Sequence, residues 1–115
     1  MNQVTLVGRL VREIQLQEVG ESKSVVNNTI AVQRIFKTEQ QQQADFIPLV
    51  AWGKVAKLLD LYCEKGDLIG INGKMQSRSY INSENITIFV VEMRVEEIQF
   101  LQNKRTEETI AIVEP

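Results

Sequence analysis

Hydrophobic and polar residues alternate along most of the chain, and this period of two is typical of half-buried β-strands. The alternation predicts five strands, over residues 3–10 with a continuation to residue 19, and over residues 25–35, 45–52, 68–78 and 86–101. Residues 54–63 change period, because Val55, Leu58, Leu59 and Tyr62 follow the i, i+3, i+4, i+7 spacing of an amphipathic helix. The expected order is therefore three strands, one short helix and two strands.

This order matches an all-β OB-fold, a five-stranded Greek-key barrel, here with one short helix between strands 3 and 4 that plugs one end. The expected domain covers residues 1–101, and residues 102–115 form a short acidic tail that we expect to be flexible. Gly8 suggests a bulge or bend of the kind that closed barrels need. Pro48 cannot donate to a ladder hydrogen bond, so we expect a local bulge there.

The residue types argue against catalysis and against a metal site. The chain has no histidine, which removes the commonest general base and metal ligand, and its carboxylates form no ligand cluster. The single cysteine, Cys63, is expected to be a small buried residue, and one cysteine fits a reducing compartment. We expect no enzyme activity, cofactor or metal. Without a signal segment or a long apolar run, the expected location is the cytoplasm.

Charge is distributed unevenly along the chain, whose formal net charge is −2. Residues 1–94 carry a net charge of +1, and residues 95–115 carry −3. Affinity for phosphates follows the local potential, so a nucleic-acid partner would require local clusters of lysine and arginine. The bulk charge neither supports nor excludes such a partner.

Two of the seven aromatic residues share one face of the third predicted strand. Phe46 and Trp52 are six residues apart, and the opposite face carries Ile47, Leu49 and Ala51, which already form a core row. A strand of an antiparallel sheet buries both faces only if something covers the second one. Parity alone leaves two interpretations open, which are rings displayed for a ligand and rings buried in a second interface.

Aromatic residues also lie beside basic ones at three strand ends. Rings can stack on bases at about 1–3 kcal/mol each while cations neutralise phosphates, so this pairing is what a nucleic-acid single strand requires. The three clusters are Phe36 with Arg34 and Lys37, Trp52 with Lys54, and Tyr80 with Lys74, Gln76 and Arg78.

Five collinear segments carry a family resemblance. They are residues 2–10 (NQVTLVGRL), 29–32 (TIAV), 51–56 (AWGKVA), 62–66 (YCEKG) and 73–80 (GKMQSRSY). As a set they resemble the bacterial single-stranded DNA-binding proteins. The resemblance implies a homotetramer of OB-folds around which single-stranded DNA wraps, to be protected in replication, recombination, repair or DNA uptake. It also implies a cytoplasmic, nucleoid-associated protein.

The resemblance also implies a set of site residues. The base-stacking rings of the family fall on Phe36, Phe46, Trp52 and Tyr80. The candidate phosphate-binding residues are Arg9, Arg34, Lys37, Lys54, Lys74 and Arg78.

One departure from the family concerns the tail. Residues 106–115 (TEETIAIVEP) are acidic but lack the usual terminal Pro-Phe, so recruitment of replication or repair proteins through the tail is not expected. Such a tail would suit an accessory, phage or plasmid form, or a shortened one. The alternative function is a primosome-type OB-fold accessory or protein-interaction module, in which the same rings are buried between subunits.

Overall fold

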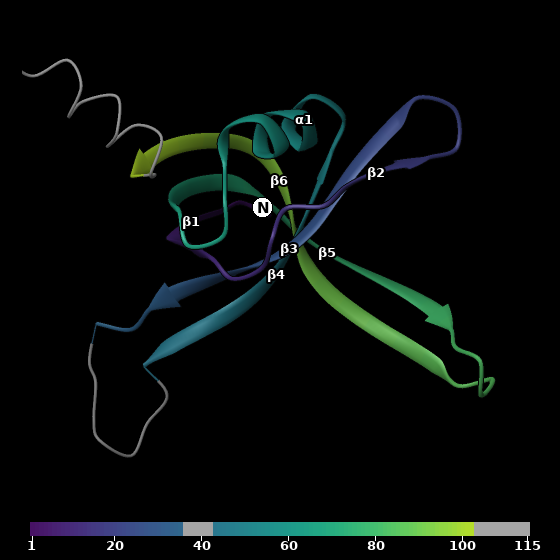
Figure 1. Ribbon diagram of the computed structural model, residues 1–115. Coiled ribbons are helices and arrows are strands. Elements are labelled where there is room, and N and C mark those ends of the chain that lie inside the picture. The colour runs from purple at the N-terminus through teal and green to yellow at the C-terminus, as the bar shows by residue number, and fades with distance from the viewer. Residues whose placement is uncertain (36–42, 103–115) are drawn as a thin grey trace, which may run out of the picture.

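The computed structural model describes residues 1–35 and 43–102, and these residues form a strand-rich barrel with one helix (Figure 1). The elements are β1 Val4–Leu10, β2 Leu16–Val19, β3 Lys23–Gln33, β4 Ala44–Trp52, α1 Gly53–Tyr62, β5 Leu68–Ile81 and β6 Thr87–Gln102. The first predicted strand is divided into β1 and β2, so the helix expected after the third strand follows β4. The break is held by Asn28, whose side chain donates to the Arg12 carbonyl and accepts from the Arg12 amide.

The sheet closes on itself. The strand order is β1-β5-β6-β4-β3-β2, and an additional pairing joins β1 to β3 at Arg9–Ala31 and Leu10–Ile30. β4 meets β6 in parallel through only two residue pairs, Leu49–Met93 and Val50–Arg94. The remaining neighbours pair antiparallel. The predicted OB-fold is confirmed.

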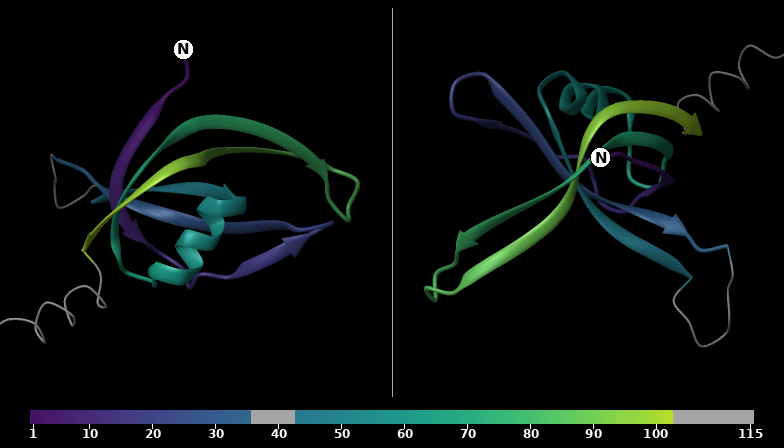
Figure 2. Two further views of the ribbon diagram at one scale, coloured as in Figure 1. Left: turned by 90° about the horizontal axis from the view of Figure 1, so that it is seen from above. Right: turned by 180° about the vertical axis from the view of Figure 1, so that it is seen from behind.

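The core fills the barrel and the space beneath α1. Its fully buried side chains come from all the barrel strands and the helix: Leu10, Ile30, Leu49, Leu59, Ile69, Ile71 and Met93. Of the stripe predicted for the helix, Leu59 is buried in this core and Val55 packs against it, whereas Tyr62 is exposed. Ala56, which was outside the predicted stripe, is also buried, and α1 packs against one end of the barrel (Figure 2). Cys63 is buried in the same cluster, as expected. Among the described residues, no helix has the length and apolarity needed to cross a bilayer.

Gly8 and Pro48, the two residues expected at bulges or bends of the strands, have other roles. The register between β1 and β5 runs without a shift through Gly8, where a Cβ would collide with the Ala31 carbonyl of β3. The glycine therefore allows the close approach that closes the barrel. The bulge expected at Pro48 is wrong, because Pro48 pairs with Thr29 in continuous register. β4 pairs with β6 only beyond Pro48, so the missing donor lies where the strand has a free edge, and proline is tolerated there.

Two hairpin wings extend from the barrel and diverge in Figure 1. The β3–β4 wing consists of residues 31–35 and 43–47, and the β5–β6 wing of residues 76–92. The tip of the β5–β6 wing is a polar turn. The Asn82 side chain accepts hydrogen bonds from the amides of Glu84 and Ile86, and Asn85 adopts a positive φ of 64°.

Candidate nucleic-acid interface

Phe46 and Trp52 lie on the outer face of β4. Phe46 is 54% exposed and Trp52 is 37% exposed, while Leu49 and Ala51 on the opposite face are buried. This is the outcome that alternation predicts for a strand with one face on the core. Burial of both rings in the chain's own core is therefore excluded, and both remain accessible to a partner.

Trp52 is held where β4 ends and α1 begins. Its backbone is extended, with φ −120° and ψ 150°, and it pairs with Val25 of β3. Gly53 follows with a φ of 60°, a left-handed conformation that glycine adopts without a steric penalty. The junction fixes the direction from which the indole leaves the barrel.

Two surface grooves meet at Trp52. One has a volume of about 670 Å³ and is also lined by Lys23, Gln76 and Arg94. The other has a volume of about 690 Å³ and is also lined by Lys74, Gln76 and Arg94, together with one acid, Glu96. The indole therefore lies between two hollows that β5 and β6 share with β4.

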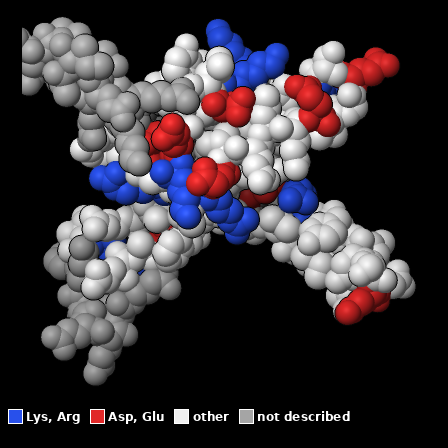
Figure 3. Space-filling model, viewed as in Figure 1, with Lys and Arg blue, Asp and Glu red and all other residues white. Residues whose placement is uncertain are grey.

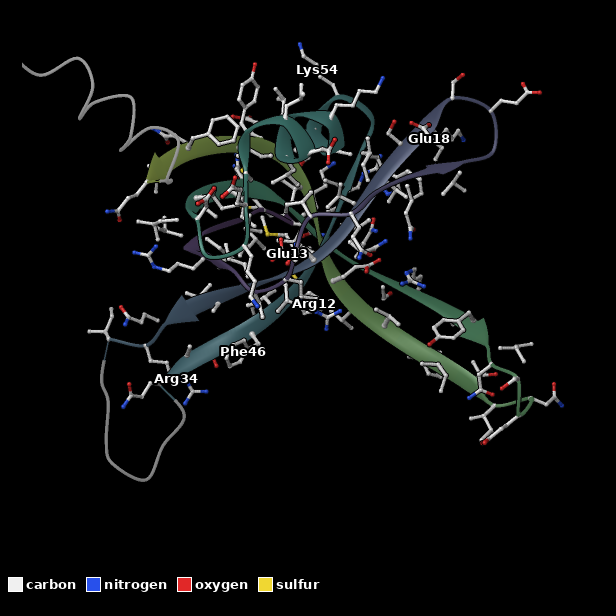
Figure 4. The ribbon with its side chains drawn as sticks, in the orientation of Figure 1. Arg12, Glu13, Glu18, Arg34, Phe46 and Lys54 are labelled. Carbon is white, nitrogen blue, oxygen red and sulfur yellow. The ribbon has the colours of Figure 1, made fainter. Side chains whose placement is uncertain are left out.

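Three cations surround these grooves. Lys23, Lys74 and Arg94 are exposed, and Lys74 lies directly opposite Arg94 across β5 and β6. Within residues 1–35 and 43–102, none of the three side chains forms an ion pair or a hydrogen bond. A separate basic area near the crossing of the two wings in Figure 3 includes Arg12, which Figure 4 labels there beside Glu13. Three cations against one groove acid, Glu96, leave net positive charge next to the exposed indole, which is suited to a polyanion with flat bases.

Sequence reasoning identified Lys74 but missed Lys23 and Arg94. Lys23 lies between the predicted strands, and Arg94 has no aromatic neighbour along the chain. The signal for Arg94 was its place between Met93 and Val95, which marks an outward-facing position on an otherwise apolar strand. Its neighbours in space come from β4 and β5, which no local pattern shows.

Tyr80 lies on the β5–β6 wing and is 47% exposed. The Cζ atom of Arg78 lies 5.8 Å from the centroid of its ring, within the range of a cation–π interaction. The Nε of Arg78 also donates to Oε1 of Glu92 at 2.9 Å. This hydrogen bond raises the pKa of the Arg78 guanidinium further above its ordinary value.

The β3–β4 wing, which carries Phe46, also carries an ion pair. Arg34 forms an ion pair with Asp45, with an Nη2–Oδ1 distance of 2.7 Å, and the Arg34 Nε donates to the same carboxylate. The hydrogen bonds from Arg34 lower the pKa of Asp45 below its usual range. Figure 4 shows Arg34 and Phe46 on this wing. Asp45 therefore compensates the charge of Arg34 at the surface.

Known proteins resemble the chain over most of its length. The sequence model of the Single-strand binding protein family matches residues 1–101. The chain belongs to this family. Single-stranded DNA-binding protein 3 of Clostridium acetobutylicum is 45% identical over 103 residues, which are 89% of this chain and 72% of that protein. Single-stranded DNA-binding protein B of Bacillus subtilis is 37% identical over 107 residues, 92% of this chain and 95% of that protein. The resemblance drawn from the sequence is confirmed.

Two further candidates of this single-strand binding family member, Arg9 and Lys54, do not line the grooves at Trp52. Arg9 donates to the Gly66 carbonyl at 2.9 Å and to Gln102 at 3.3 Å, so it ties β1 to the residues before β5 and to the end of β6. Lys54 lies in the first turn of α1 and points away from the barrel in Figure 4. Phe36 and Lys37 lie outside the described residues. The structure thus groups Trp52 with Lys74 and leaves Arg9 apart from them.

Proposed function

We propose that the chain binds single-stranded DNA without sequence preference, and that the strand runs from Phe46 across Trp52 to Tyr80. Family membership supports the class of ligand, and the relatives named above are DNA-binding proteins. The observation that carries the proposal for this site is the exposed indole of Trp52 between two grooves of net positive charge, which are bordered by Lys23, Lys74 and Arg94 against one acid.

The proposed chemistry is stacking plus charge neutralisation. Each ring offers a π-face that any base can stack on, which is why such binding tolerates all sequences. Lys23, Lys74 and Arg94 neutralise phosphates beside Trp52, and each contact releases counterions from the DNA. The chain binds rather than reacts, and its site of action is the nucleoid in the cytoplasm. From their positions in the sequence, Phe36 and Lys37 add a further stacking ring and a further cation to this DNA path.

A titration tests the proposal. Oligothymidine added to the protein should quench Trp52 fluorescence, and a labelled oligonucleotide should report the same affinity by anisotropy. Trp52→Ala should weaken binding by about 5- to 150-fold, the equivalent of one lost stacking contact. Tyr62→Ala is the matched control, because Tyr62 is also exposed but packs against Phe100 at the end of α1. Equal affinity for the parent and Trp52→Ala would reject the site.

The same experiment addresses the protein-interaction alternative. A module whose rings are buried between subunits would leave the Trp52 emission unchanged up to high micromolar DNA. The proposed binder should instead show quenching that weakens with added salt, by about 0.7 log units of affinity per log unit of salt for each phosphate contact.

We also propose that the chain assembles into a homotetramer. A second apolar area supports self-association on the face of β1, β5 and β6 away from the wings. Val7 and Leu101 are exposed there, and they border a groove with Gly70 and Ile98. A domain of 115 residues buries a limited share of its surface alone, so covering this area would stabilise it. Native mass spectrometry measures the oligomer directly, and a monomeric mass would reject this part of the proposal.

A further inference from the structure

Glu92 is a buried acid in the middle of the β5–β6 wing. Its side chain is 5% exposed, although its neighbours Val91 and Arg94 on the same strand are exposed. A buried carboxylate is costly unless a partner compensates it. Arg78 supplies that partner at 2.9 Å, and the Gln76 side chain contributes a longer contact at 3.5 Å. Neither the fold nor the proposed stacking accounts for an acid at this position.

The strand register places Glu92 in line with Tyr80. Gln76 pairs with Glu92 across the wing, so Glu92, Arg78 and Tyr80 all point to the same face. Arg78 lies between the two, with its Nε on the carboxylate and its Cζ 5.8 Å from the centroid of the Tyr80 ring. Tyr80 remains 47% exposed with the guanidinium over its ring, so ring surface is left for a base.

The pairing also changes what Arg78 can contribute electrostatically. The Glu92 charge compensates the Arg78 charge at hydrogen-bond distance, so the pair is neutral as seen by a phosphate. Lys74 lies on the same face of β5 and, in the part of the chain described, has no such partner. The two basic residues of this strand are therefore not equivalent.

We propose that Glu92 is a positioning residue for DNA binding: it holds Arg78 over Tyr80 and thereby fixes the ring as a stacking surface. Arg78 acts through Tyr80 and is not a phosphate ligand. This inference rests on the proposed function, because it assumes that Tyr80 stacks on a base. It differs from the sequence-based expectation, which assigned Arg78 to phosphate.

The test replaces the ion pair by a neutral pair of similar shape. In Arg78→Gln/Glu92→Gln, the side chains can still hydrogen-bond, no buried charge is left alone, and the net charge of the protein is unchanged. Affinity for oligothymidine should fall about two- to fivefold, which corresponds to an exposed cation–π contact. The dependence of affinity on salt should keep the slope of the parent, and the loss should vanish when the pair is exchanged in a Tyr80→Ala background.

Lys74→Gln serves as the matched control. It should lower the salt slope by about 0.7, and its effect should persist in the Tyr80→Ala background. Glu92→Gln alone is the second variant, since it removes the compensating charge and leaves Arg78 in place. Its salt slope should be steeper than that of the parent by about 0.7. Thermal melts of each variant verify folding.

The outcomes distinguish a failure of the proposed DNA-binding site from a failure of the positioning role of Glu92. A parent that does not bind DNA, or a Tyr80→Ala variant that binds like the parent, would reject the proposed role of Tyr80 in binding. With those two results as expected, the positioning role is overturned if the double exchange lowers the salt slope by about 0.7, or if its loss remains in Tyr80→Ala. An unchanged slope in Glu92→Gln would equally overturn it.

Discussion

Arg94 offers the sharpest test of the DNA path, because it stands where the two wings separate. It pairs with Val50 of β4 on one side and with Lys74 of β5 on the other. A strand that passes from Phe46 to Tyr80 has to cross this point. We therefore consider Arg94→Gln, which removes the charge and keeps part of the aliphatic stem beside buried Val50.

The size of the effect follows from counterion release. Each phosphate neutralised on a single strand contributes a salt slope of about 0.7. If Arg94 makes one contact, its loss lowers affinity about eightfold at roughly 0.05 M salt and about threefold at roughly 0.2 M. The stability of the fold should not decrease, because Arg94 faces a like charge on Lys74 directly across the strands.

Anisotropy titrations of labelled oligothymidine at four salt concentrations measure the slope, and thermal melts measure the stability. Lys65→Gln is the control, because Lys65 is exposed in the connection between α1 and β5, outside both grooves at Trp52. Its slope should equal that of the parent. A parental slope in Arg94→Gln as well would refute a path across the junction of β4 and β6.

Three further changes have defined outcomes. In Asp45→Asn, the folded protein should be less stable than the parent at pH 7. Arg34 lowers the pKa of Asp45, so the stability that this ion pair contributes is present above the ordinary carboxyl pKa and is lost as the pH falls through the lowered value. Thermal melts of parent and variant from pH 7 to pH 2 should therefore converge. A constant difference between them would contradict the lowered pKa. Gly8→Ala should destabilise the barrel by about 1–3 kcal/mol or more in urea titrations, because its Cβ meets the Ala31 carbonyl, and a neutral result would contradict the close approach. Val7→Asp should reduce the native mass of the assembly, and an unchanged mass would exclude the β1–β5–β6 face as the contact.

The alternation of residues was sufficient to predict most of the fold. It located the barrel strands, the helix and the outer position of Phe46 and Trp52, because a strand with one face on a core has to display the other. It could not predict the break between β1 and β2, which depends on a hydrogen-bonded Asn28 sixteen residues away from Arg12. Pro48 was misplaced because its tolerance depends on how far β6 extends beside β4.

The site was less predictable because charges act through space. Arg34 and Arg78 looked alike in the sequence, as bases next to aromatic residues, but each has an acid within 3 Å. The acid that compensates Arg78 is Glu92, fourteen residues later on another strand. Arg94, which has no such acid among the described residues, showed no local signal. Positions along the chain indicate which basic and aromatic residues can act together. Strand register determines which of the basic side chains are paired with an acid.

The β5–β6 wing also determines the distance between Trp52 and Tyr80, the two rings proposed to stack on bases. From Gly73 to Ile81 the register between β5 and β6 runs without a shift, so each residue pair lengthens the wing by a constant amount. Removing two residues from each strand would bring Tyr80 closer to Trp52 by about 7 Å and keep the ring on the same face. Removing one from each would turn the ring to the other face. The length of this hairpin can therefore change in even steps that keep Tyr80 on its face, and on the proposed DNA path each step would change the length of DNA between Trp52 and Tyr80.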